Sequence, residues 1–229
     1  MAISTDQFIE SLGAHHRVLL LGGLAVIAHG LDRMTRDTDI WLEPMDNSTA
    51  WSNALCEAMS RAPLTQPFDL AAKQVVALSD IAAVVETYGV VRLLGFDRPL
   101  DVFRRPNNLE CTDFQEAWEH ASVRLGSIRV LDEIDMLITK EGTQRPQDFA
   151  DISFLESKVH AHYQHLLPHC AYKEAQKLFA RYADTTICEF ALQNPDPNVQ
   201  KLALTTLHDL AQDGNPFARD ALERHHRTS

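Results

Sequence analysis

The segment from residue 17 to residue 42 restricts the fold more than any other part of the chain. A short apolar run, 17–21, ends at Gly22 and Gly23, and apolar residues then recur at helical spacing. This order predicts a buried strand that enters a tight turn and continues into a helix packed by one face. After a polar loop, residues 37–42 alternate between polar and apolar at first, which predicts a second strand.

Strand and helix patterns alternate along the rest of the chain up to residue 157. Two apolar runs, 90–96 and 100–103, flank a turn and predict a hairpin, and a second small hairpin surrounds Gly126. Helical patterns, the first capped by Asp6, cover residues 6–13, 48–61, 69–87, 112–120, 132–140 and 146–156. We therefore predict an α+β (α/β) fold in which helices flank a mixed β-sheet.

The chain from residue 158 onward has no strand pattern. One helical face is shared by Val199, Ala203, Leu207 and Leu210, and residues 196–222 have the pattern of a single HEAT-type helical pair. We predict two regions, an α/β domain over residues 1–157 and an α-helical C-terminal appendage over residues 158–229.

Composition limits the kinds of partner. The formal net charge is −11, so the chain has no overall attraction for a phosphate backbone, and a polyanionic partner would need a local basic patch. No apolar run is long enough to span a bilayer, the N-terminus has no secretory pattern, and the four cysteines are scattered. These features predict a cytoplasmic protein without a membrane partner.

Three aspartates are the candidate metal ligands. Asp37 and Asp39 lie two residues apart in a predicted strand, so both side chains leave the same face, where they repel each other. A divalent cation removes this repulsion, and carboxylate oxygens suit Mg²⁺. Asp101 is a lone acid in another predicted strand, and we prefer it as the third ligand over Asp97, which lies at a predicted turn. Three carboxylates on one sheet face can bridge two metal ions and support an in-line phosphoryl or nucleotidyl transfer.

The diglycine turn and nearby arginines are candidate phosphate contacts. Gly22 and Gly23 allow the backbone to approach an anion closely at the start of a helix. Arg36 precedes the first acid, and its planar guanidinium suits a phosphate group. Arg104 and Arg105 come three and four residues after Asp101 and, with Arg33 and Arg36, would surround the site if the strands pair as predicted.

This order of strand, diglycine, helix, Asp-x-Asp and later strand acid resembles the nucleotidyltransferase superfamily, which includes DNA polymerase beta and kanamycin nucleotidyltransferase. Residues 20–42, LLGGLAVIAHGLDRMTRDTDIWL, carry the resemblance most clearly. Residues 130–155 look like a second landmark, found in the bacterial minimal branch with abortive-infection and type IV toxin-like members. The residues that match this landmark are Lys140, Arg145, Asp148 and Asp151.

The resemblance covers roughly residues 15–157 and implies a nucleotidyltransferase fold with a nucleoside triphosphate as substrate. It implies that Asp37, Asp39 and Asp101 hold Mg²⁺ at a two-ion site, with Mn²⁺ as an alternative, and that Lys140 contacts phosphate or nucleotide. The acceptor hydroxyl could belong to an RNA end such as tRNA, to a protein or to a small molecule.

Two other functions stay open. One is a catalytically silent relative that binds a nucleotide or a partner protein, with an antitoxin-like partner in a toxin–antitoxin or phage-defence system. The other is a helical-repeat interaction protein that works through its C-terminal segment.

Overall fold

The computed structural model of the protein describes residues 4–143 and 145–228. The chain divides into two units, Met1–Ile152 and Ser153–Ser229. The boundary falls within the long helix α7 (Pro146–Leu166), and the boundary predicted from the sequence, at residue 157, lies in the same helix.

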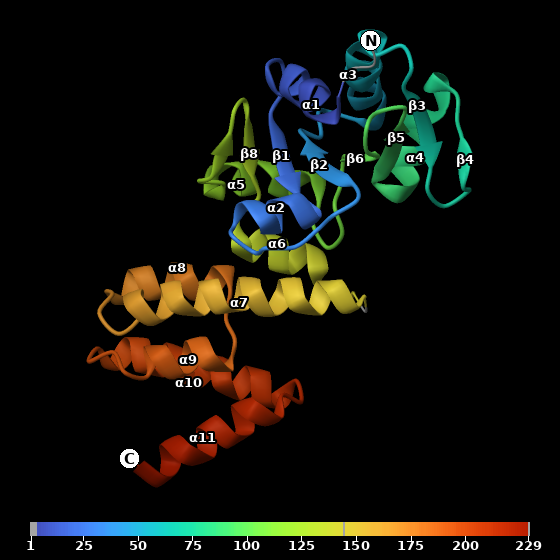
Figure 1. The fold of residues 1–229 in the computed structure, drawn as a ribbon. Coiled ribbons are helices and arrows are strands. Elements are labelled where there is room, and N and C mark those ends of the chain that lie inside the picture. The colour runs from blue at the N-terminus through green and yellow to red at the C-terminus, as the bar shows by residue number, and fades with distance from the viewer. Residues whose placement is uncertain (1–3, 144, 229) are drawn as a thin grey trace. The chain divides into compact units, whose positions relative to one another are not determined.

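The first unit contains an eight-stranded mixed sheet with the strand order β4-β3-β5-β6-β2-β1-β8-β7. The pairs β1–β8 and β2–β6 are parallel, and the other neighbours are antiparallel. The strands are β1 (Val18–Leu21), β2 (Thr38–Leu42), β3 (Gln66–Asp69), β4 (Gln74–Val75), β5 (Val90–Leu94), β6 (Leu100–Phe103), β7 (Arg124–Leu125) and β8 (Ile128–Val130). Strand β2 lies between β1 and β6 (Figure 1). The mixed sheet flanked by helices, expected from the sequence, is confirmed.

Helices of the first unit are interspersed among these strands. They are α1 (Thr5–Gly13), α2 (Gly22–Ala28), α3 (Ser48–Ser60), α4 (Ile81–Tyr88), α5 (Phe114–His120) and α6 (Glu133–Lys140), with short 3₁₀ turns at η1 (Leu78–Asp80) and η2 (Cys111–Asp113). The predicted cap of α1 is wrong by two residues. Ser4 accepts from the backbone N–H of Gln7 in a capping box, and Asp6 lies in the first turn.

The helices predicted over residues 69–87 are wrong in their first half. Asp69 ends β3 and accepts hydrogen bonds from the N–H groups of Ala71 and Ala72, which closes a turn into β4. Lys73 has a φ of 54°, a left-handed conformation that no helix continues through. Only the segment after η1 is helical, as α4.

The strand register puts the acids on one face of the sheet. Asp39 lies opposite Leu21 on β1 and Asp101 on β6, and Asp101 lies opposite Arg92 on β5. Because side chains alternate along a strand, these residues share one face. The next residues face the other way and are fully or almost fully buried: Leu20, Ile40, Val91 and Val102.

Helix α5 covers part of the face that carries the acids. Trp41 lies on this face, two residues after Asp39, and contacts the ring of Phe114 edge-on with centroids 5.0 Å apart. Its indole N–H donates to the carbonyl of Arg104 at 2.9 Å. This packing fixes the strand that carries Asp39.

The second unit is helical throughout the residues that the structure describes. After α7 come α8 (Tyr172–Arg181), α9 (Thr185–Ala191), α10 (Pro197–Gln212) and α11 (Pro216–Thr228), and α10 contacts α8, α9 and α11. The predicted helical face of Val199, Ala203, Leu207 and Leu210 is confirmed for its first three residues, which are fully buried, whereas Leu210 is partly exposed. The HEAT-type interpretation stays a prediction. Among the described residues no helix combines the length and the hydropathy needed to cross a bilayer.

Candidate metal centre

Asp37, Asp39 and Asp101 meet on one face of the sheet. One carboxylate oxygen from each residue lies within 4.8 Å of the other two. The parallel pairing of β2 with β6 sets Asp39 against Asp101, and Asp37 precedes β2 by one residue on the same face. Asp101 is buried, at 5% exposure, and the other two are partly exposed. The group is therefore anchored in the protein and still open to solvent.

Asp97, the competing choice for the third acid, serves a different purpose. Its Oδ1 accepts from both the backbone N–H and the hydroxyl of Thr5, each at 2.7 Å, at the start of α1. These hydrogen bonds hold the pKa of the Asp97 carboxyl below its usual range. Asp97 thus fixes the first helix to the β5–β6 turn and does not join the other acids.

Burial and the two neighbouring carboxylates together perturb the acidity of Asp39. Burial, and then the charges of Asp101 and Asp37, raise the pKa of Asp39 from 3.8 to about 7, against the opposing charges of Arg92 and Lys140. A donor set made only of carboxylate oxygens suits a hard divalent cation, which would relieve this repulsion. The residues present therefore fit Mg²⁺ or Mn²⁺.

Arg92 is a site residue that the sequence analysis missed. From β5 its Nε donates to Oδ1 of Asp101 and its Nη2 to Oδ2, each at 2.7 Å, and Nη2 lies 3.5 Å from Oδ2 of Asp37. The hydrogen bond to Asp101 raises the pKa of the guanidinium above its already high value. The available signal was a single charged residue inside the apolar run Val90–Leu94.

The diglycine bend makes room for the acids. Gly22 has a φ of 65°, and a Cβ there would lie 1.9 Å from Oδ2 of Asp39. At Gly23 a Cβ would lie 2.4 Å from Nη2 of Arg33 and 2.7 Å from Oγ1 of Thr35. Glycine is therefore required at position 22, and at position 23 a larger residue would displace the side chains of Arg33 and Thr35 in the loop before the acids.

Lys140 lies in a buried network of ion pairs. Its Nζ is 2.9 Å from Oδ1 of Asp148 and 2.8 Å from Oδ2 of Asp151, and Arg145 donates to Asp148 at 2.6 Å. Arg33 approaches Oδ1 of Asp151 at 3.2 Å. The Asp151 contacts are electrostatic, since within the described residues neither of its oxygens has hydrogen-bond geometry. Lys140 therefore has two carboxylate partners. Its positive charge also acts on Asp39, where it opposes the rise in pKa.

The candidate arginines lie in different surroundings. Arg36 is exposed and forms no ion pair within the part of the chain that the structure describes. Arg104 donates to the carbonyl of Pro44 and faces Glu86, and Arg105 faces Glu110. The expectation that Arg104 and Arg105 surround the acids is therefore wrong, because both are paired elsewhere.

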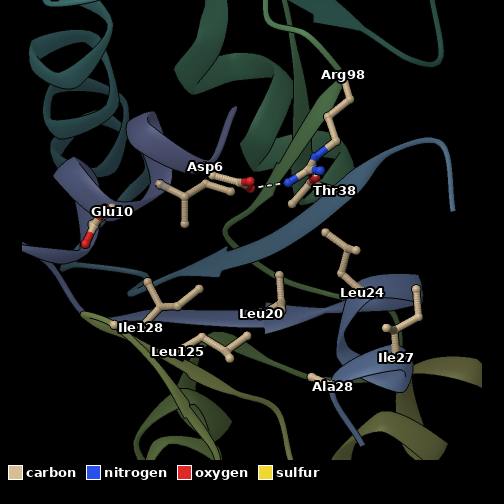
Figure 2. Close-up of a pocket in the computed structure, with 12 residues that line it drawn as sticks. Asp6, Glu10, Leu20, Leu24, Ile27, Ala28, Thr38, Arg98, Leu125 and Ile128 are labelled. Atoms are coloured by element: carbon tan, nitrogen blue, oxygen red, sulfur yellow. Dashed lines mark hydrogen bonds and ion pairs between the residues drawn. The ribbon is translucent and has the colours of Figure 1, made fainter. Parts of the chain in front are cut away.

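A pocket of about 570 Å³ is drawn in Figure 2. Strand alternation places it on the side of the sheet opposite the acids. Leu20 and Thr38 contribute to its wall, and they alternate with Leu21 and Asp39 along their strands. Arg98 at its rim donates from Nε to the hydroxyl of Thr38 at 2.7 Å. The pocket is mostly apolar and is separate from the metal centre.

Comparisons with known proteins give little further information. No protein-family model and no curated protein matches the chain. The solved structures include a "putative nucleotidyltransferase" from H. pylori with 14% sequence identity and a TM-score of 0.35, a match that covers 98% of this chain and 96% of that one. A TM-score this low does not establish a shared function.

Proposed function

We propose that the protein is a metal-dependent nucleotidyltransferase, which moves a nucleoside monophosphate from a nucleoside triphosphate to an acceptor hydroxyl. The observation that carries this proposal is the convergence of Asp37, Asp39 and Asp101 within 4.8 Å on one sheet face. A packed domain has no structural need for this convergence, because like charges held together destabilise it.

Each residue of the centre has a proposed part. Asp37, Asp39 and Asp101 would hold Mg²⁺ or Mn²⁺, which supplies positive charge for the triphosphate and lowers the pKa of the attacking hydroxyl. Arg92 orients the carboxylate of Asp101 through its two hydrogen bonds. The oxygen–phosphorus bond to the acceptor forms as the bond to pyrophosphate breaks, and the acceptor proton passes to solvent.

Nucleotide binding is assigned to the residues around the acids. The exposed guanidinium of Arg36 is free to meet a phosphate group, and Gly22 and Gly23 keep the approach open beside Asp39. Lys140 contributes positive charge from within its ion-pair network, in which its Nζ donates to Asp148 and lies 2.8 Å from an oxygen of Asp151. The acceptor hydroxyl belongs to an RNA end, a protein or a small molecule, and the labelled product of the test below identifies which.

The competing proposal is a catalytically silent protein that binds a nucleotide or a partner, including an antitoxin-like one. Its supporting observation is Arg92, which occupies both oxygens of Asp101. A carboxylate has about four lone-pair sites, so this contact still leaves acceptor capacity for a cation.

The test is transfer of label from α-labelled nucleoside triphosphates to components of a cell extract in Mg²⁺. The proposal predicts a labelled product with α-label and none with γ-label, lost in Asp37→Asn and Asp39→Asn. Asp209→Asn, an exposed position on α10, is the matched control and should label normally. A product that survives both centre substitutions, or its absence with every nucleotide, contradicts the proposal.

A further inference from the structure

Arg92 is the cation in direct contact with the acid cluster. Its guanidinium forms a two-pronged contact with Asp101 at 2.7 Å for each prong and reaches Asp37 at 3.5 Å. Within residues 4–143 and 145–228, no other side chain forms an ion pair with Asp37, Asp39 or Asp101. The nearby Lys140 is already matched by two buried carboxylates.

The position of Arg92 follows from the sheet. Arg92 lies directly opposite Asp101 in the antiparallel pair β5–β6, and its side chain is 25% exposed. A guanidinium stays charged at every physiological pH. It is also part of the chain, whereas a bound metal ion exchanges with solvent. The cluster therefore has a permanent positive partner that the fold itself supplies.

We propose that Arg92 is a built-in countercharge for the three carboxylates, so that its presence weakens the binding of a divalent cation to the same cluster. This inference deepens the proposed function and rests on its metal site. The guanidinium uses one lone pair on each oxygen of Asp101, so Arg92 and a cation share the cluster, and their coupling is electrostatic. Arg92 thereby sets how readily the centre gains and loses its metal.

The experiment is a Mn²⁺ titration by calorimetry, without nucleotide and at fixed ionic strength. Arg92→Met and Arg92→Gln remove the charge, and Gln keeps a hydrogen-bond donor for Asp101. Both should bind Mn²⁺ roughly tenfold more tightly or better, as expected for the loss of one nearby positive charge. Arg92→Lys keeps the charge and should stay within about threefold of wild type.

Arg17→Met is the matched control, because Arg17 is ion-paired with Glu43 at the opposite end of β2. It should bind Mn²⁺ like the wild type. Thermal melting in chelator adds a second measurement. Both neutral variants should melt below wild type without metal and gain more than wild type from Mn²⁺, because the cation then replaces the missing charge.

Unchanged or weaker Mn²⁺ binding in the neutral variants overturns the inference. So does a Lys variant that binds as tightly as the Met variant, since charge would then not be the cause. Because no nucleotide is present, the result is separate from transfer activity. Tighter binding in the neutral variants together with a wild type that transfers no label would refute the enzyme and leave the countercharge standing.

Discussion

Replacing Asp39 by asparagine should stabilise the metal-free protein at high pH. The pKa of Asp39 is raised from 3.8 to about 7 in the folded protein. Between about pH 4 and pH 7 the folded state therefore holds a proton that the unfolded chain has released, so the free energy of unfolding falls as pH rises through this window. Asparagine has nearly the same shape but does not ionise, so the free energy of unfolding of the variant does not fall for this reason.

The size of the pKa shift of Asp39 sets how much more stable Asp39→Asn should be than the wild type. About three pKa units correspond to roughly 4 kcal/mol at 1.36 kcal/mol per unit. This value is an upper bound, because Asp39 is partly exposed and solvent screens its charge. At about 2–4 °C per kcal/mol for a chain of this length, the difference between variant and wild type should reach several degrees at pH 8.

Thermal melts in chelator at pH 5 and pH 8 test this prediction. The wild type should lose stability relative to Asp39→Asn between these two values, and Mg²⁺ at pH 8 should restore the wild type alone. Asp97→Asn is a control of opposite sign. The pKa of the Asp97 carboxyl is lower in the folded protein than in the unfolded chain, so the ionised carboxyl stabilises the fold at pH values above the unfolded pKa. Asp97→Asn should therefore be less stable than the wild type at both pH 5 and pH 8.

The reasoning fails if the difference between wild type and Asp39→Asn does not change from pH 5 to pH 8. It also fails if the variant is the less stable protein at pH 8 without metal. Either result would mean that burial and the charges of Asp101 and Asp37 do not raise the pKa of Asp39 in the folded protein.

Three further substitutions follow from the geometry of the centre. Gly22→Ala should abolish Mn²⁺ binding and lower the melting temperature, because the new Cβ would lie 1.9 Å from Asp39. Gly142 also has a positive φ, 76°, but a Cβ there would meet no atom within 4 Å, so Gly142→Ala should show only backbone strain. Equal effects of the two substitutions would refute the steric argument. Lys140→Met leaves two buried carboxylates without their shared partner and should cost about 3–5 kcal/mol in urea unfolding, and a loss under 1 kcal/mol would contradict the buried network. Arg36→Glu should raise the KM for nucleoside triphosphate with an unchanged melting temperature, and an unchanged KM would remove this residue from the nucleotide site.

The sequence predicted the acids better than it predicted their surroundings. Asp37 and Asp39 share a face because strand side chains alternate, which local pattern reveals. Asp101 was identified as a lone acid in an apolar strand, but its meeting with Asp39 depends on the parallel β2–β6 pairing between residues far apart in the chain. Arg92 was missed for the same reason, since its role exists only across the β5–β6 pair.

Local chemistry explains the errors in the fold. Residues 70–76 contain apolar and alanine residues that favour a helix, yet Asp69 closes a tight turn there and Lys73 adopts a left-handed conformation. Pairing of β4 with β3 then outweighs helical propensity in this segment. The contacts of Arg104 were mispredicted because its partners, the carbonyl of Pro44 and the side chain of Glu86, come from distant segments.

The central claim, that three carboxylates on one sheet face hold a divalent cation, is tested most directly by anomalous diffraction from crystals grown with Mn²⁺. The account predicts a manganese peak bonded to oxygens of Asp37, Asp39 and Asp101, and its disappearance in Asp39→Asn crystals. A peak bonded elsewhere on the chain, or a peak that persists at the same place in Asp39→Asn, would contradict it.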